Sequence, residues 1–218
     1  MKIRSIFPSI DGEVNAYHQG RLTTFIRTSN CNLRCSYCDT KYAQYEESGK
    51  EMSISKIVGK VLEYGLDKIT ITGGEPLIQA DGVKALVKEF AKLKKLVTIE
   101  TNGSIDTRGY SPSRMVVDYK LPSSGMEQSM ILPAFESLST GDIIKFVVSD
   151  RVDFQRALQI QDTFAGLQGV IFAYSPMLTK DGDRGQSARL LKWMLTNPRK
   201  NMAFNLQLHK IINLKEPE

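Results

Sequence analysis

Short apolar segments alternate with amphipathic segments along most of this chain, and this alternation restricts the fold more than any other feature. Six segments are predicted to be buried strands because they are near-continuous runs of apolar and β-branched residues. They are Leu22–Thr28, Lys68–Thr72, Leu96–Glu100, Met115–Lys120, Ile143–Val148 and Val170–Tyr174. A seventh strand is expected over Ala203–Leu208, where it would close the core.

Helical spacing of apolar residues occupies several intervals between these strands. Ser53 is predicted to cap a helix whose apolar residues are Ile54, Ile57, Val58, Val61 and Leu62. Similar spacing predicts helices around 83–93, 154–160 and 190–195, the last ended by Asn197-Pro198. Strands that alternate with helices imply right-handed βαβ crossovers. We therefore predict an α/β fold with one domain over residues 1–218, an incomplete TIM-like barrel of about six parallel strands with reduced helical cover.

Polar motifs follow the predicted strands at their carboxyl ends, which is where barrels of this kind place their active sites. The motifs are Cys31–Cys38, Thr72–Pro76, Glu100–Gly103, Asp118–Lys120 and Tyr174–Pro176. Since the carboxyl ends of parallel strands lie on one side of a barrel, we expect these motifs to face a single pocket.

All three cysteines, Cys31, Cys35 and Cys38, fall in one loop with C-x3-C-x2-C spacing. Thiolates select zinc, copper(I) or iron–sulfur clusters. Three cysteines leave one iron of a cubane open to another ligand, whereas a closed structural zinc site takes four protein ligands. The alternative is therefore a Cys3His zinc site completed by His18 or His209.

The cysteine spacing, with Tyr37 directly before the last cysteine, resembles the signature of the radical S-adenosylmethionine superfamily. The resemblance implies that S-adenosylmethionine chelates the open iron and is cleaved reductively to a deoxyadenosyl radical, which abstracts hydrogen from the substrate. Gly73-Gly74-Glu75-Pro76 resembles the second signature, which contacts the methionyl amino group. Alone, this sequence is a turn more often than a site.

Other polar positions have both a structural and a functional interpretation. Arg27 in an apolar strand costs several kcal/mol unless it is paired, either with an acid such as Glu100 or with a substrate carboxylate. Asp39-Thr40 is either a turn or the source of one oxygen for magnesium. The stretch Asp118–Gly125 is either a polar turn with an ion pair or a set of hydrogen-bonding groups around cofactor and substrate.

These motifs together resemble 7-carboxy-7-deazaguanine synthase over about residues 5–214. The matching elements are Gly12-Glu13, Arg27, the cysteines with Asp39-Thr40, Thr72–Pro76, Glu100–Gly103, Asp118-x-Lys120-x-Pro122-Ser123-Ser124 and Gln207–Lys210. The resemblance implies a radical SAM barrel and a lyase that converts 6-carboxy-5,6,7,8-tetrahydropterin to 7-carboxy-7-deazaguanine with loss of ammonia, in queuosine and deazapurine biosynthesis. It also implies a homodimer and an electron donor such as flavodoxin or ferredoxin.

The same resemblance implies roles for single residues. Cys31, Cys35 and Cys38 would hold a [4Fe–4S] cluster, and Thr40 would bind Mg²⁺. The S-adenosylmethionine site would comprise Tyr37, Cys38, Asp39, Gly73, Gly74, Glu75, Asp118, Tyr119 and Lys120. Substrate contacts would come from Ile10, Asp11, Gly12, Glu13, Arg27 and Thr72.

Two features depart from the family pattern. Its usual Gln-Gly-Glu-Gly is here Asp11-Gly12-Glu13-Val14, and an acidic Asp11 is expected to alter pterin recognition. The chain also continues past Leu214 through Lys215–Glu218, whereas in some members a C-terminal carboxylate comes near the substrate.

Composition narrows the remaining function classes. The chain has 218 residues and a net charge of +5, with no apolar run long enough for a membrane span and no signal-peptide pattern, so we expect a cytoplasmic protein. Many lysines have helical spacing, which favours a solvated surface over direct contact with nucleic acid. The alternatives are a glycyl-radical activating enzyme or another small radical SAM enzyme, and, from another class, a zinc-stabilised basic RNA-binding module.

Overall fold

A single nine-stranded sheet runs through the computed structural model, which describes residues 1–178, 182–212 and 214. Its strands are β1 (Lys2–Ile10), β2 (Leu22–Thr28), β3 (Lys50–Glu51), β4 (Lys68–Gly73), β5 (Leu96–Thr101), β6 (Arg114–Tyr119), β7 (Ile143–Val148), β8 (Ile171–Pro176) and β9 (Met202–Phe204). The order is β3-β1-β2-β4-β5-β6-β7-β8-β9. From β2 to β9 every neighbouring pair is parallel, and only β1 pairs antiparallel with β2 and β3.

The six predicted strands are confirmed, with ends that shift by at most one residue, except that β8 ends at Pro176, two residues later than predicted. The seventh, β9, is shorter than expected because the chain leaves the sheet after Phe204. The antiparallel strand β1 was not predicted. Beyond Lys2 and Ile3 the outer side of β1 pairs with no other described strand, and Pro8 is tolerated at such an edge.

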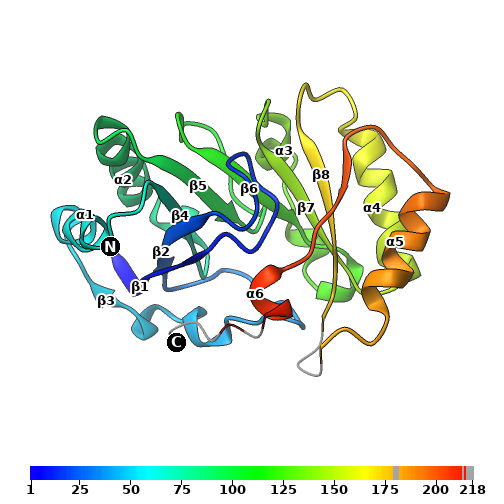
Figure 1. The fold of residues 1–218 in the computed structure, drawn as a ribbon, viewed down its shortest axis with the longest axis horizontal. Helices are drawn as coiled ribbons and strands as arrows, with labels where there is room; N and C mark the ends of the chain where they lie inside the picture. Colours follow the sequence, from blue (N-terminus) through cyan, green and yellow to red (C-terminus); the bar gives the residue numbers. More distant parts are fainter. Residues whose placement is uncertain (179–181, 213, 215–218) are drawn as a thin grey trace.

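Helices cover only part of the sheet (Figure 1). They are α1 (Ile54–Glu63), α2 (Ala80–Lys92), α3 (Pro133–Glu136), α4 (Arg151–Thr163), α5 (Gln186–Thr196) and α6 (Leu208–Ile211). Short 3-10 turns are η1 (Lys41–Ala43), η2 (Glu46–Ser48), η3 (Pro76–Gln79), η4 (Pro122–Ser124) and η5 (Glu127–Ser129). No helix connects β5 to β6, which agrees with the expected reduced cover.

Local sequence explains where the longer helices begin and what they bury. The Ser53 hydroxyl accepts the Lys56 N–H at 3.3 Å and caps α1, as predicted. In α2 the apolar face is Val83, Leu86, Val87 and Phe90, all buried against the sheet. None of the described helices is both long enough and apolar enough to cross a membrane.

Side-chain alternation separates the two faces of the sheet. Apolar side chains such as Ile26, Ile71, Ile99, Val117 and Phe146 belong to the main core, which also contains the buried faces of α1, α2, α4 and α5. Their neighbours along the strands point to the opposite face and include many polar and charged groups. That second face therefore forms the candidate site. The C-terminal residues Lys215–Glu218, which depart from the family pattern, lie outside the described residues.

Candidate active site

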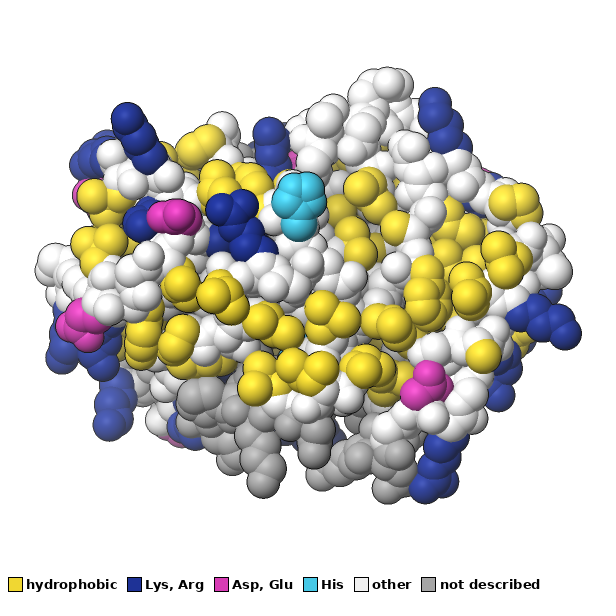
Figure 2. All heavy atoms as spheres, viewed as in Figure 1, with side chains coloured by type: hydrophobic (Ala, Val, Ile, Leu, Met, Phe, Trp, Pro, Cys, Tyr) yellow, Lys and Arg dark blue, Asp and Glu magenta, His cyan; other side chains and the backbone are white. Residues whose placement is uncertain are grey.

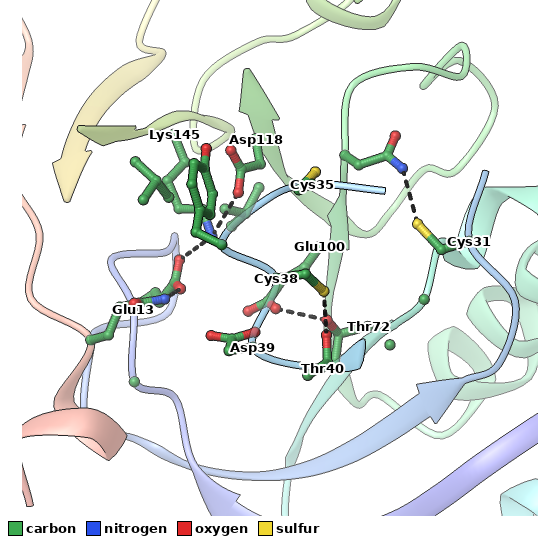
Figure 3. A pocket seen from close by; sticks show the side chains of 18 of the residues that line it. Glu13, Cys31, Cys35, Cys38, Asp39, Thr40, Thr72, Glu100, Asp118 and Lys145 are labelled. Atoms are coloured by element: carbon green, nitrogen blue, oxygen red, sulfur yellow. Dashed lines mark hydrogen bonds and ion pairs between the residues drawn. The ribbon is translucent and has the colours of Figure 1, made fainter. Parts of the chain in front are cut away.

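A cavity of about 670 Å³ lies at the carboxyl ends of the parallel strands (Figure 3). Residues from β2, β4, β5, β6 and β7 form its walls, together with the loop after β1, the cysteine loop and α6. The predicted residues that line it are Gly12, Glu13, Arg27, Cys31, Cys35, Tyr37, Cys38, Asp39, Thr40, Thr72, Gly73, Gly74, Asp118 and Lys120. The fold therefore brings 14 of the 18 predicted site residues to one cavity, as the strand-end argument predicts.

The three cysteines lie on the cavity wall as free thiols. Backbone hydrogen bonds hold the start of their loop, since the N–H of Asn30 and Cys31 donate to the carbonyls of Ala43 and Gln44, each at 3.0 Å. Cys31 Sγ lies 3.7 Å from Asn102 Nδ2, and Cys38 Sγ lies 3.7 Å from the Thr40 hydroxyl. Burial raises the pKa of the Cys31 and Cys35 thiols. The positive charge of a bound metal centre would therefore be needed to stabilise the thiolate form of both side chains.

Among the described residues, no three His, Cys, Asp or Glu side chains converge on the position of a single metal ion. A tetrahedral zinc with bonds of about 2.3 Å needs sulfurs about 3.8 Å apart. A cubane spreads its thiolates more widely, because each sulfur binds a different iron. Three free thiols that line one cavity are soft ligands of the kind that an iron–sulfur cluster takes.

Gly73 and Gly74 let two segments of backbone pass very close to each other. Gly73 has φ +131°, and a Cβ on Gly74 would lie 2.0 Å from the Asn30 carbonyl oxygen. The N–H of Gly74 donates to the Thr28 carbonyl at 3.0 Å, and the N–H of Glu75 donates to the Asn30 carbonyl at 2.7 Å. The glycines thus hold the entry to the cysteine loop against the end of β4.

The Glu75 side chain is buried away from the cavity. Its carboxylate accepts hydrogen bonds from the N–H groups of Leu77 and Asn102 and from the Thr101 hydroxyl, at 2.7–2.9 Å. These bonds connect η3 to the end of β5. The predicted contact of Glu75 with a cationic amino group would have to compete with all three donors.

A ladder of alternating charges crosses the cavity from Glu13 to Lys120. Lys145 Nζ lies 2.8 Å from Glu13 Oε2 and 3.2 Å from Asp118 Oδ2, and Lys120 Nζ lies 2.9 Å from Asp118 Oδ2. Asp118 and Lys145 are register partners on β6 and β7, which explains their contact. Burial by itself would lower the pKa of Lys145, but Glu13 and Asp118 outweigh it and raise that pKa.

Two buried polar atoms in this region have no hydrogen-bonding partner among the described residues, Asp118 Oδ1 and the Tyr37 hydroxyl. Unpartnered polar groups are costly inside a protein, so a ligand bound in the cavity would stabilise these two atoms by supplying partners. Both residues line the cavity beside the cysteines. Their position fits the predicted contacts with S-adenosylmethionine.

Glu100 at the end of β5 accepts a hydrogen bond from the Thr72 hydroxyl at 2.9 Å. Burial, with the nearby Glu13 charge in second place, raises the pKa of Glu100 to about 7. The Arg27 guanidinium lies on the same cavity wall as Phe25 and Thr72 in the parallel part of the sheet, 5.5 Å from the Phe7 ring centroid and 5.8 Å from that of Tyr42. The cavity therefore contains an acid that titrates near neutrality and a stacked planar cation.

The segment at and before α6 closes another side of the cavity. Gln207 Nε2 donates to Glu13 Oε1 at 2.5 Å, and Lys210 Nζ lies 2.8 Å from Asp39 Oδ2. Burial would raise the pKa of Asp39, but the Lys210 ammonium outweighs it and lowers that pKa to about 2. Asp39 is therefore an anion at neutral pH.

Four predicted contacts do not line the cavity: Ile10, Asp11, Glu75 and Tyr119. Asp11 is buried behind the cavity wall, where it forms an ion pair with Lys68. Tyr119 points to the opposite face of β6 and packs against Phe135 and Phe146 in the core. Its neighbours Asp118 and Lys120 do face the cavity, because side chains alternate along a strand.

The prediction missed five lining residues of evident chemistry: Glu100, Lys145, Gln207, His209 and Lys210. Four of them lie inside motifs that had been noted without a role for these residues. Lys145 was overlooked, although a lysine in the apolar run Ile143–Val148 is as unusual as Arg27 in its strand. The burial cost that drew attention to Arg27 would have identified Lys145 too.

Similarity to known proteins identifies the superfamily and the family. The model of the Radical SAM superfamily matches residues 25–116. The chain is similar to the 7-carboxy-7-deazaguanine synthases of Clostridium acetobutylicum, at 36% identity over 97% of this chain and 95% of the relative, and of Thermoplasma acidophilum, at 34% over 97% of each. A third from Methanospirillum hungatei is 37% identical over 98% of this chain and 86% of the relative.

Among solved structures, QueE from Escherichia coli has the same fold, with a TM-score of 0.74 over 94% of this chain and 93% of that one at 21% identity. The match to the radical SAM superfamily argues against a zinc site at the cysteines. The relatives, which match nearly the whole chain, argue against a glycyl-radical activating enzyme. A [4Fe–4S] cluster and S-adenosylmethionine follow as cofactors. The chain belongs to the 7-carboxy-7-deazaguanine synthase family of the radical SAM superfamily.

Proposed function

We propose that this enzyme converts 6-carboxy-5,6,7,8-tetrahydropterin to 7-carboxy-7-deazaguanine with loss of ammonia, the whole chain acting as one domain. The observation that carries the proposal is the cavity, whose lining includes both the three cysteines and the ladder Glu13–Lys145–Asp118–Lys120. When bound, the cluster and S-adenosylmethionine supply a deoxyadenosyl radical. The residues of the chain bind, orient and shield the reacting molecules.

Opposite charges in the cavity suit a substrate with a carboxylate and a pterin ring. Arg27 offers a planar, bidentate donor to the carboxylate. The Glu13 carboxylate, fixed by Lys145 and Gln207, offers an acceptor to the N–H groups of the pterin edge. Thr72 and Gly12 line the wall between them. Glu100, with a pKa of about 7, can hold or release a proton near the ring.

The proposed magnesium site involves Thr40. Its hydroxyl lines the cavity beside Cys38, and the ionised carboxylate of Asp39 is the adjacent residue. Mg²⁺ uses few protein ligands and takes its other oxygens from water and substrate. One hydroxyl in a cavity that also admits the substrate carboxylate suits this preference.

Two partners complete the proposal, a low-potential electron donor such as flavodoxin or ferredoxin, and a second copy of the chain. Asn32, Arg34 and Ser36 are exposed, so a cluster held by this loop lies near the surface. For the dimer, Figure 2 shows hydrophobic side chains across the middle of one face. The exposed large apolar residues include Ile211 and Ile212 at the end of α6. Light scattering of the purified protein tests the dimer directly.

The decisive experiment is product analysis. The protein is reconstituted with iron and sulfide without oxygen, then mixed with S-adenosylmethionine, Mg²⁺, a strong reductant and the carboxypterin. Mass spectrometry should show 7-carboxy-7-deazaguanine, and ammonia should form in equal amount. Glu13→Gln should lower kcat/KM at least tenfold while S-adenosylmethionine cleavage without substrate stays unchanged. Cleavage without any deazapurine product would refute the substrate assignment.

A further inference from the structure

The Asp153 carboxylate, in the first turn of α4, is fully buried and makes more contacts than a helix cap requires. Its Oδ1 accepts the Ser123 N–H at 3.0 Å. Its Oδ2 accepts the Ser149 N–H at 2.9 Å and also the Ser123 hydroxyl. The helix already has a cap, because Asp150 accepts the Asp153 N–H at 2.9 Å. The two bonds to Ser123 therefore serve something other than helix capping.

Ser123 belongs to η4, the turn directly after Lys120. Inside this turn the Ser124 hydroxyl donates to the Leu121 carbonyl at 2.6 Å and accepts the Met126 N–H at 3.0 Å. Gly125 ends the turn with φ +72°. The turn is thus internally bonded, and Asp153 fixes it to the end of the sheet.

The outer side of η4 holds the cysteine loop. The Ser36 N–H donates to the Ser124 carbonyl at 3.0 Å, and the Ser36 hydroxyl donates to the Ser123 carbonyl at 2.7 Å. Ser36 is the residue after Cys35, inside the C-x2-C part of the motif. A continuous chain of hydrogen bonds therefore runs from α4 through η4 to the segment that carries Cys35 and Cys38.

We propose that Asp153 is a positioning residue for the iron–sulfur cluster, acting through Ser123, Ser124 and Ser36. It touches neither the cluster nor the substrate. Groups that orient the ligands of a metal centre typically change its affinity by 10- to 100-fold when removed. Two cysteines on an exposed loop depend on such support, because the loop itself provides no core packing at Ser36. The proposal rests on the cluster that the family implies and not on the identity of the substrate.

The test compares Asp153→Asn with Asp150→Ala after anaerobic reconstitution. Asparagine keeps the size of the side chain but presents an NH2 group to the donors of Ser123. Asp150→Ala removes the cap of the same helix and leaves η4 untouched, so it is the matched control. Iron and sulfide per chain and the rate at which a chelator bleaches the visible absorbance are measured, together with the Tm of the apo protein. We expect Asp153→Asn to lose its cluster about tenfold faster than Asp150→Ala does.

Ser36→Ala provides a second arm that does not risk the fold, because Ser36 is exposed. It should also accelerate cluster loss, with an unchanged apo Tm. The double variant with Asp153→Asn should lose its cluster at nearly the rate of the faster single variant, because both changes break one chain of bonds. Wild-type cluster retention in Ser36→Ala, or in a folded Asp153→Asn, would overturn the proposal. Since these readouts use no pterin, failure of the proposed function would leave them unaffected.

Discussion

The buried ion pair between Lys68 and Asp11 offers a sharp test of how the loop that carries Glu13 is held. Lys68 begins β4 with its side chain fully buried, and its ammonium also donates to the Thr70 hydroxyl at 2.7 Å. That hydroxyl donates in turn to Asp11 Oδ1 at 2.8 Å. The backbone of Asp11 closes the loop, because its N–H donates to the Arg21 carbonyl at 2.8 Å and its carbonyl accepts the Gly20 N–H at 2.7 Å.

The perturbation is Lys68→Met, which keeps the length of the side chain and removes its charge. Breaking a buried ion pair by removing one partner costs about 3–5 kcal/mol, because an uncompensated charge stays behind. Asp11 would retain two donors, the Thr70 hydroxyl and the Asn15 amide at 3.1 Å. We therefore expect the lower end of the range, about 3 kcal/mol.

The double variant Asp11→Asn with Lys68→Met removes both charges. Replacing a buried pair by neutral groups of similar volume is often neutral or stabilising, so we expect it to lie within about 1 kcal/mol of the wild type. Urea unfolding of the apo protein in reductant measures all members of the cycle. The surface pair Lys95–Asp67, with N–O distance 3.3 Å and an aspartate that is 75% exposed, is the control, and Lys95→Met should cost less than about 1 kcal/mol.

A Lys68→Met variant no less stable than Lys95→Met would refute the reasoning. So would a double variant whose loss of stability equals the sum of the two single losses, because the two side chains would then act independently. The result also bears on substrate recognition. The departure at Asp11 was expected to alter pterin binding, but the structure gives this carboxylate a cation of its own behind the cavity wall.

Three further outcomes test other parts of the site. Gly74→Ala should lower the iron content after reconstitution and cost about 1–3 kcal/mol of stability by urea unfolding, because the new Cβ would lie 2.0 Å from the Asn30 carbonyl oxygen. The control is Gly59→Ala in α1, where no atom lies near the position of the new Cβ, and it should be neutral or stabilising. Lys145→Met should destabilise the apo protein by about 3–5 kcal/mol in the same assay, since two buried carboxylates lose their shared cation. The pKa of Glu100 is raised from 4.5 to about 7, so its contribution to stability is complete below about pH 4.5 and is lost as the pH rises through 7. At pH 8, Glu100→Gln should therefore be more stable than the wild type by up to about 3 kcal/mol. At pH 4.5 the variant should be no more stable than the wild type, and urea unfolding at both pH values measures the two differences.

Runs of apolar and β-branched residues were sufficient to locate six of the parallel strands, because one face of each strand packs in the core and most residues of the other face are also buried. This pattern failed for β1, where only one side of the strand is paired over most of its length and Pro8 and polar residues are allowed. The strand-end rule then located the cavity. It depends only on topology, so it did not require any knowledge of which side chains touch.

Contacts between distant segments could not be predicted in this way. Gln207 bonds to Glu13 across 194 positions in the chain, and Asp153 bonds to Ser123 across 30. Neither position has an unusual local composition. Their partners are set by how α4 and the segment before α6 pack onto the sheet, and that packing is determined by the apolar residues around them.

One additional step of sequence reasoning would have corrected one error at the site, and the register of the sheet explains a second. Side chains on a strand alternate, so Arg27 on β2 and Asp118 on β6 establish which positions face the cavity. The same alternation excludes Tyr119, the last residue of β6, which had been assigned to the cofactor site, and it includes Lys120 directly after the strand. On β7 the register that pairs Asp118 with Lys145 places the lysine on the same face. A charged residue on the cavity-facing side of an otherwise apolar strand is thus evidence for a site. An aromatic residue on the other side of the strand belongs to the core, even when a site motif surrounds it.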